Sequence, residues 1–177
     1  MSQGADVAYT FRPLARTLWR GAFSCGVREL DGWFIKKAWD HHDKLRGRVT
    51  TIHSSVDDTL VGFYAICITL EEDRLLDKNS HLKRFAIGRH FPTLQVQYLA
   101  VQKEFQENGI GTIAMGKIID TFRQVALLTG VPVMTLTALN SRAARLYSTW
   151  GFVPYGGFGS LRMLLPSQSV FALDPTD

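Results

Sequence analysis

The sequence predicts a mixed α/β fold in which helices flank a central sheet, and three observations support this. Strand-like and helix-like segments alternate along the chain, without an internal repeat or a linker. The length of 177 residues suits a single domain, since domains average roughly 150 residues. Apolar residues make up 46% and charged residues 20%, which excludes general disorder.

The first half of the chain predicts three strands and one helix. Weak alternation predicts a strand over residues 7–12. Residues 27–41 place apolar side chains on one face and predict a helix that Ser24 can cap. Residues 48–53 and 60–70 predict neighbouring strands, and the polar stretch 71–89 predicts a loop or a short helix.

The second half predicts a buried strand followed by a long helix. Residues 93–101 are β-rich and mostly apolar. Apolar residues then recur at spacings of three and four from Gly111 to Val125, and Gly130 closes this helix. The remaining predicted elements are a strand over 131–138, a helix to Trp150 that Asn140 or Ser141 caps, and strands over 152–155, 160–165 and near 168–173.

Basic residues are concentrated in the first part of a chain whose net charge is +4. Between Arg12 and Arg48, nine basic residues are opposed by four acidic ones, with aromatic residues interleaved. This pattern is typical of a polyanion-binding surface, or alternatively of a solvated helix face above buried aromatic side chains. Under the first alternative, the candidate RNA contacts are Lys36, Lys37, Arg46 and Arg48.

A turn with two glycines, Gln106-Glu107-Asn108-Gly109-Ile110-Gly111, separates the buried strand from the long helix. Such a turn can bind phosphate, because the first N–H groups of a helix lack partners and the helix dipole adds positive potential. Glycines let the backbone approach a bulky anion. A plain strand-to-helix turn is the alternative explanation.

Two motifs in this region resemble the GNAT superfamily of N-acetyltransferases. Gln106-x-x-Gly109-x-Gly111 matches the family pattern Q/R-x-x-G-x-G/A. The second motif is an asparagine, a short helix, a tyrosine and a Gly-Phe pair, which stand here as Asn140, Tyr147 and Gly151-Phe152. The resemblance implies one GNAT domain over residues 1–177.

The resemblance also implies that acetyl-CoA is the acetyl donor. Its pyrophosphate would be held by the backbone of Gln106, Glu107, Asn108, Gly109, Ile110, Gly111 and Thr112. Leu99, Ala100 and Val101 would pair with the pantetheine arm, and an N–H group near Val101 could polarise the thioester carbonyl. Asn140 resembles the residue that helps hold the CoA arm, and it also suits a helix cap. Tyr147 resembles the tyrosine that protonates the departing thiolate, although a core aromatic is the alternative.

The N-terminal part resembles the GNAT toxins of bacterial toxin–antitoxin pairs. Phe23-Ser24-Cys25-Gly26 followed by Leu30-Asp31 and Trp33-Phe34 carries this resemblance, together with Val61-Gly62-Phe63-Tyr64-Ala65. Those toxins acetylate the α-amine of aminoacyl-tRNA. The resemblance therefore implies aminoacyl-tRNA as the acceptor and an antitoxin as a partner, and it allows a homodimer. Glu107 stands where the toxins often have glycine, and Tyr98 where they usually have arginine.

The side chains near the motifs favour an α-amine acceptor. His90 and Glu104 are the only candidate bases, and neither is compelling. An α-amine titrates near pH 8, so part of it is neutral at pH 7, whereas a lysine amine titrates near 10.4 and needs a base. The alternatives are an acetyltransferase that acts on a small amine or a protein N-terminus, and a binding module without catalysis.

Cysteine usage and hydropathy indicate the environment of the protein. Cys25 and Cys67 form neither a disulfide framework nor a metal-binding pattern. We find no signal-peptide pattern, and no apolar stretch approaches the ~20 residues that span a bilayer. The sequence thus predicts a cytoplasmic protein with no metal and no membrane association.

Overall fold

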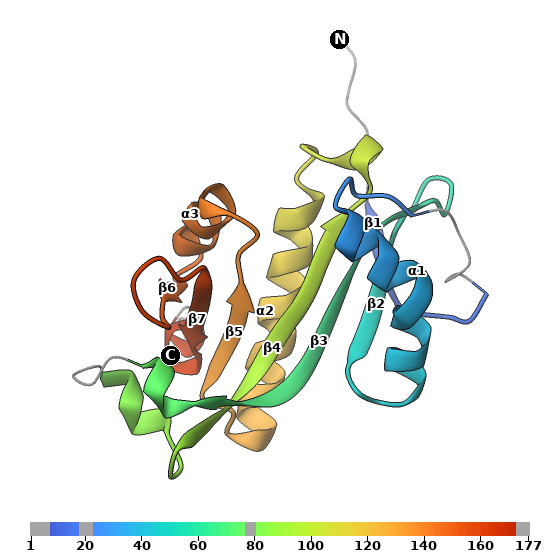
Figure 1. Cartoon of the computed structure of the whole chain (residues 1–177). Coiled ribbons are helices and arrows are strands. Elements are labelled where there is room, and N and C mark those ends of the chain that lie inside the picture. Colours follow the sequence, from blue (N-terminus) through green and yellow to red (C-terminus); the bar gives the residue numbers. More distant parts are fainter. Residues whose placement is uncertain (1–7, 18–22, 77–80, 173–177) are drawn as a thin grey trace. The chain divides into compact units, whose positions relative to one another are not determined.

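The computed structural model describes residues 8–17, 23–76 and 81–172. Within them, seven strands pair in the order β1-β2-β3-β4-β5-β7-β6, and four α-helices accompany the strands (Figure 1). This agrees with the predicted mixed α/β fold. In chain order the elements are β1 (Tyr9–Pro13), α1 (Arg28–Asp43), β2 (Arg48–Ser54), β3 (Leu60–Glu72), η1 (Asp73–Leu75), η2 (His81–Phe85), β4 (His90–Val101), η3 (Lys103–Phe105), α2 (Ile110–Thr129), β5 (Val133–Thr137), α3 (Ser141–Thr149), β6 (Val153–Pro154), β7 (Arg162–Pro166) and α4 (Ser167–Phe171).

The chain divides into two units. Unit 1 comprises Met1–Ile66 and Tyr98–Met115, and unit 2 comprises Cys67–Gln97 and Gly116–Asp177. In unit 1, β2 pairs antiparallel with β1 and with β3. In unit 2, β4 pairs parallel with β5, and β7 pairs antiparallel with both β5 and β6.

An apolar core in unit 1 holds α1 on the sheet. Phe34 and Ala38 are one helical turn apart, and both are fully buried. Phe34 stacks on Phe63 of β3, with ring centroids 4.3 Å apart. Phe23 contacts both rings, at 4.9 Å and 5.1 Å. Phe23, the first residue of the Phe-Ser-Cys-Gly segment, therefore packs against both α1 and β3 and helps to hold the helix on the sheet.

A smaller core lies in unit 2. Phe91 of β4, Val133 of β5 and Leu164 of β7 are buried in it, together with Tyr155. Burial raises the pKa of the Tyr155 phenol to about 12. Thr93 and Thr135 share a buried hydrogen bond of 2.8 Å across the parallel pair β4–β5. This core holds β4, β5 and β7 together, and α3 follows β5 in the chain.

Two local predictions are wrong. Ser24 does not cap α1, because the N-cap residue is Val27 and Ser24 Oγ instead donates to Asp31 Oδ2 at 3.0 Å. The predicted strand near 168–173 is the short helix α4. Pro166 is the last residue of β7 and the N-cap of α4, and Ser167 and Val170 are buried on the same side of this short helix. Residue 7 of the first predicted strand and residue 173 lie outside the described residues.

The other predicted elements agree with the structure to within a few residues. The polar stretch after β3 contains the short helices η1 and η2. The long helix after the glycine turn is α2. Asn140 caps α3, as one of the two predicted alternatives requires.

Candidate active site

The predicted donor loop lies between the end of β4 and the start of α2. Leu99, Ala100 and Val101 are the last three residues of β4. After η3, residues 106–109 are exposed and lead into Ile110, the first residue of α2. All of these residues belong to unit 1. The structure therefore brings together the strand end and the loop that the sequence assigns to one ligand.

Backbone N–H groups at the start of α2 are available to an anion. Ile113 N donates to Gly109 O at 3.1 Å, so the N–H groups of Ile110, Gly111 and Thr112 come before the first bond of the helix and lack a partner within it. A Cβ placed on Gly109 or Gly111 would meet no other heavy atom within 4 Å. Open space beside unpaired donors at a helix N-terminus can accommodate a phosphate group.

The loop turns through two residues in the left-handed region of the backbone. Gly109 has φ +76° and Glu107 has φ +67°. Glycine adopts this conformation freely, whereas a residue with a side chain is destabilised by roughly 1–2 kcal/mol. The GNAT toxins often have glycine at the position of Glu107. The positive φ is a physical reason for that preference.

The Gln106 side chain ties the loop to the N-terminal segment. Gln106 Nε2 donates to Cys25 O at 2.8 Å and to Val101 O at 3.0 Å. Asp31 Oδ1 accepts from Cys25 N at 2.7 Å, and Lys103 N donates to Ser24 O at 2.9 Å. The end of β4, the loop and the segment before α1 are thus held by one hydrogen-bond network.

Asp31 is the charged member of this network. Desolvation alone would raise its pKa, but hydrogen bonds from Cys25, Ser24 and Gly26 outweigh that effect, and the pKa of Asp31 is lowered. Burial, reinforced by the hydrogen bond with Asp31, raises the pKa of the Cys25 thiol to about 11. Cys25 is therefore an inert, protonated side chain at neutral pH rather than a nucleophile.

A close approach of β3 to the end of β4 depends on Gly62. A Cβ at Gly62 would lie 2.8 Å from Ala100 O and 3.5 Å from Val101 Cα. Across the same contact, Gln102 N donates to Val61 O at 2.8 Å. The Val61-Gly62 pair therefore sets the position of the predicted donor strand.

Asn140 and Tyr147 lie on α3, in unit 2. Asn140 Oδ1 accepts a hydrogen bond from Ala143 N at 2.9 Å, which makes it the N-cap of this helix. The cap uses only the carbonyl oxygen, and the amide group of this exposed residue retains two donors. Helix capping and a contact to the CoA arm are therefore compatible.

The Tyr147 phenol is half-buried, and its ring lies 5.8 Å from the ring of Phe152, centroid to centroid. Burial raises the pKa of Tyr147 above its ordinary value of about 10. The hydroxyl group therefore keeps its proton at neutral pH. A protonated phenol suits the predicted role as an acid, which remains a prediction.

The four candidate RNA contacts lie in different surroundings of unit 1. Lys36 and Lys37 are exposed on α1 and line a cavity. Arg46 follows α1 and forms an ion pair with Asp40 at 3.1 Å. Arg48 is exposed at the first position of β2. Lys36 and Lys37 share one cavity, whereas Arg46 already has an acidic partner.

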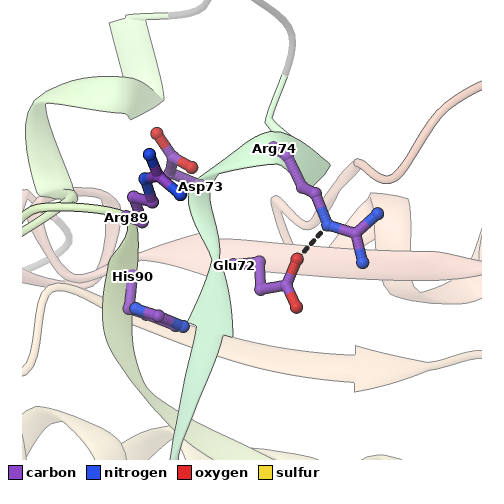
Figure 2. Close-up of a pocket in the computed structure, with 5 residues that line it drawn as sticks. All are labelled: Glu72, Asp73, Arg74, Arg89 and His90. Carbon is purple, nitrogen blue, oxygen red and sulfur yellow. Dashed lines mark hydrogen bonds and ion pairs between the residues drawn. The ribbon is translucent and has the colours of Figure 1, made fainter.

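The two candidate bases also differ in position. His90, the first residue of β4, lines a charged cavity of about 620 Å³ in unit 2 (Figure 2). Arg89 lies beside it, and Glu72 and Arg74, which also line the cavity, form an ion pair. Glu104 is exposed in η3, next to the donor loop. No cluster that could hold a metal ion is found in the described part of the chain.

Two features of the site are not predicted from the sequence. One is the structural role of Gln106 and Asp31, which both hydrogen-bond to the backbone of Cys25. The signal for it in the sequence is that the Cys25-Gly26 and Leu30-Asp31 motifs lie close together. The other is the contact of Trp33 with Tyr98, whose ring centroids are 4.2 Å apart. The Asp31–Cys25 bond spans only six residues, but the Gln106–Cys25 and Trp33–Tyr98 contacts join segments that are distant in the chain, so local spacing does not predict them.

Comparisons with solved structures show that this fold has known counterparts. A tyrosine-to-phenylalanine mutant of KacT matches with a TM-score of 0.83 and 20% identity, covering 94% of this chain and 99% of the other. AtaT complexed with acetyl-methionyl-tRNAfMet matches with a TM-score of 0.81 and 20% identity, over the same shares of the two chains. No helix among residues 8–17, 23–76 and 81–172 could cross a membrane.

Sequence comparisons identify the family. A protein of Sinorhizobium fredii (strain NBRC 101917 / NGR234), described as "Probable toxin TacT", is 27% identical over 164 residues, which cover 87% of this chain and 88% of that protein. The model of the Acetyltransferase (GNAT) family matches residues 13–152, a span that includes both the donor loop and α3. With most of its length matched in this way, the chain belongs to the acetyltransferase (GNAT) family.

Proposed function

We propose that the protein transfers the acetyl group of acetyl-CoA to the α-amine of an aminoacyl-tRNA. The observation that carries the donor half of this proposal is the loop 106–112, where the first N–H groups of α2 lack a partner within the helix and open space lies beside two glycines. Membership of the acetyltransferase (GNAT) family supports an acetyl donor. The acceptor is supported by the likeness to AtaT, which is solved in complex with acetyl-methionyl-tRNAfMet.

The residues fit the donor by their chemistry. The N–H groups from Gln106 to Thr112 would hold the pyrophosphate. Backbone groups of Leu99, Ala100 and Val101 would pair with the pantetheine arm, and Asn140 would contribute its amide donors. Acetyl-CoA supplies an activated thioester when bound. A likeness to AtaTR bound with AcCoA supports this assignment.

The reaction requires one nucleophile and one acid. The neutral α-amine attacks the thioester carbonyl and forms the new C–N bond, and an N–H group near Val101 polarises that carbonyl. The C–S bond then breaks, Tyr147 donates its proton to the thiolate, and the amine loses a proton to solvent. No strong base is required, since an α-amine titrates near pH 8.

The remaining parts of the proposal concern the protein in the cell. Residues 1–177 act as one GNAT domain in the cytoplasm. An antitoxin protein is the expected partner, supported by the likeness to AtaT bound to the C-terminus of the antitoxin AtaR. A homodimer is compatible with this arrangement.

The proposal is tested by incubating the full chain with acetyl-CoA and a total pool of charged tRNA. Mass spectrometry should detect an acetyl group on the aminoacyl end of at least one tRNA. The matched control is Tyr147→Phe, which should reduce the product strongly. If only a small amine or a protein N-terminus becomes acetylated, the assignment of tRNA as the acceptor is wrong. If nothing is acetylated although acetyl-CoA binds, the proposed acetyltransferase activity is wrong.

A further inference from the structure

A groove lies along α1, beside the part of the helix from Arg28 to Lys37. It has a volume of about 660 Å³, and its lining includes Arg28, Glu29, Trp33, Lys36 and Lys37 of α1 together with Tyr98 of β4. Tyr98 directly precedes Leu99–Val101, the strand end assigned to the acetyl donor. The groove therefore borders the donor strand within unit 1.

Positive charge predominates along the groove. Arg28, Lys36 and Lys37 are exposed there, against the single carboxylate of Glu29. Asp40, further along α1, pairs instead with Lys44 at 2.5 Å and with Arg46 at 3.1 Å. Within the described residues, we find no ion pair that involves Arg28, Lys36 or Lys37. Their charges remain available to an anionic ligand.

An aromatic column leads from the core into the groove. Phe63 is fully buried, and Trp33 stacks on it with ring centroids 5.9 Å apart and planes 19° apart. Tyr98 then lies 4.2 Å from Trp33 and is half-buried. Trp33 is the only ring that Tyr98 contacts among the described residues. Tyr98, whose ring plane is tilted 36° to that of Trp33, is therefore the outer end of a supported column and lines the groove.

We infer that this groove binds the single-stranded 3′ end of the RNA acceptor, with a base stacked on Tyr98 and phosphates at Arg28, Lys36 and Lys37. Cations that follow a backbone beside an aromatic platform are the combination that binds single strands. Glu29 can accept a hydrogen bond from a ribose 2′-hydroxyl or a base amino group. The inference rests on the proposed aminoacyl-tRNA acceptor, and it assigns the base contact to a residue that is usually arginine in the toxins.

The first test measures binding of a labelled single-stranded RNA that ends in CCA, and of the same RNA with abasic sugars at its last three positions, to the full chain. Base stacking on aromatic side chains should make the intact RNA bind about tenfold more tightly than the abasic RNA. Tyr98→Leu should remove this preference, and Tyr98→Phe should retain it. Tyr98→Arg should steepen the salt dependence, because it adds a cation that can contact a phosphate.

The cations are tested with Lys36→Ser/Lys37→Ser. Two lost phosphate contacts should reduce the slope of log affinity against log salt by roughly 1.4, at about 0.7 per contact for single strands. The base preference should remain. Lys117→Ser, an exposed lysine of α2 outside the groove, is the matched control and should change neither quantity.

The outcomes separate this inference from the proposed function. If the wild type acetylates aminoacyl-tRNA and Tyr98→Leu leaves the preference for intact RNA and the KM for aminoacyl-tRNA unchanged, the groove assignment is wrong and the function stands. If no tRNA is acetylated but the RNA still binds with a Tyr98-dependent base preference, the groove assignment stands and the function is wrong. A polyglutamate peptide that binds as tightly as RNA, with no effect of Tyr98→Leu, would overturn the groove assignment in favour of an acidic peptide.

Discussion

Glu107 and Gly109 show how single residues shape the donor loop. Both have positive φ, yet only glycine adopts that conformation without strain. Asn108 stabilises the turn between them, since its Nδ2 donates to Phe105 O at 3.2 Å and to Gln106 O at 3.3 Å. The loop therefore keeps its shape with one glycine fewer than the toxins often have. Its anion-binding capacity depends on the remaining glycines.

Gly109 provides the sharpest test of the loop. Asp and Asn both tolerate positive φ, and a side chain at this position meets open space. We expect Gly109→Asp to reduce acetyl-CoA affinity by on the order of 10²-fold, because its carboxylate would lie beside the pyrophosphate. Gly109→Asn, which has the same shape without the charge, should change the affinity only a few-fold. Titration calorimetry distinguishes the two, and equal affinities for both variants would remove the phosphate assignment.

The substitution Tyr147→Phe tests the proposed role of Tyr147 as the general acid. Tyr147→Phe keeps the ring and its packing on Phe152 but has no proton to donate. We expect kcat to decrease by about 10²-fold or more, with acetyl-CoA affinity and melting temperature nearly unchanged. Burial raises the pKa of the phenol above its ordinary value of about 10, so the midpoint of the activity loss caused by its ionisation should lie above about pH 10. A fully active Tyr147→Phe enzyme would make Tyr147 a packing residue.

At the scale of elements, the segment before α1 supports the donor site although it contributes no residue to the predicted set. Asp31 holds Cys25 N, and Cys25 O in turn accepts from Gln106. Gln106 also bonds to Val101 O at the end of β4. One carboxylate at the start of α1 is thereby connected, through the backbone N–H and C=O of Cys25 and the side chain of Gln106, to the loop that begins α2.

Asp31→Ala should test this connection. It leaves the Cys25 N–H group without its acceptor, so we expect acetyl-CoA affinity to decrease by roughly tenfold, since a lost hydrogen bond to a charged group costs about 1.5 kcal/mol and about 1.4 kcal/mol is a tenfold change in affinity. The KM for acetyl-CoA should rise while kcat changes little, and Asp31→Asn should recover part of the affinity.

Asp43→Ala, at the other end of the same helix, is the matched control and should have no effect on donor binding. In a double-mutant cycle, Asp31→Ala and Gln106→Ala should be non-additive, because both act through the Cys25 peptide. Additive effects, or unchanged affinity in a folded Asp31→Ala, would contradict the connection.

At the scale of the whole molecule, a buried neutral histidine contributes to the stability of unit 1. His42 is 7% exposed, and its Nδ1 accepts from Val49 N at 3.1 Å, which links α1 to β2. Desolvation, reinforced by the charge of Arg48, lowers the pKa of His42. An imidazolium has no free lone pair at Nδ1, so protonation would also break this hydrogen bond.

We expect the protein to lose stability in mild acid. Because the folded pKa of His42 is lower than the unfolded value of about 6.5, the unfolded state binds more protons, and the unfolding free energy falls as the pH drops below about 6.5. The decrease should level off below the folded pKa. Urea denaturation at pH 5.5 and 7.5 measures it. His42→Asn should be less stable at pH 7.5 but should lose less on acidification, and an identical pH dependence in both proteins would assign the effect to other groups.

The sequence by itself determined the alternation of elements, because hydrophobic periodicity is a local property. It predicted α2 from its apolar spacing and the cap of α3 by Asn140. It also located the glycines of the donor loop, since strand, glycine turn and helix follow one another in the chain. The family followed from two short motifs whose residues are close in sequence.

Only the tertiary structure decided which partners the side chains take. The local sequence predicts Ser24 as a helix cap, but its hydroxyl group donates a hydrogen bond to the Asp31 carboxylate, and Val27 is the N-cap residue. The bond from Gln106 to Cys25 joins residues 81 positions apart, and the Trp33–Tyr98 contact joins α1 to β4. Such contacts exist because folding brings distant strands and helices together to bury apolar surface, and periodicity within one segment carries no information about the side chains that a distant segment will present.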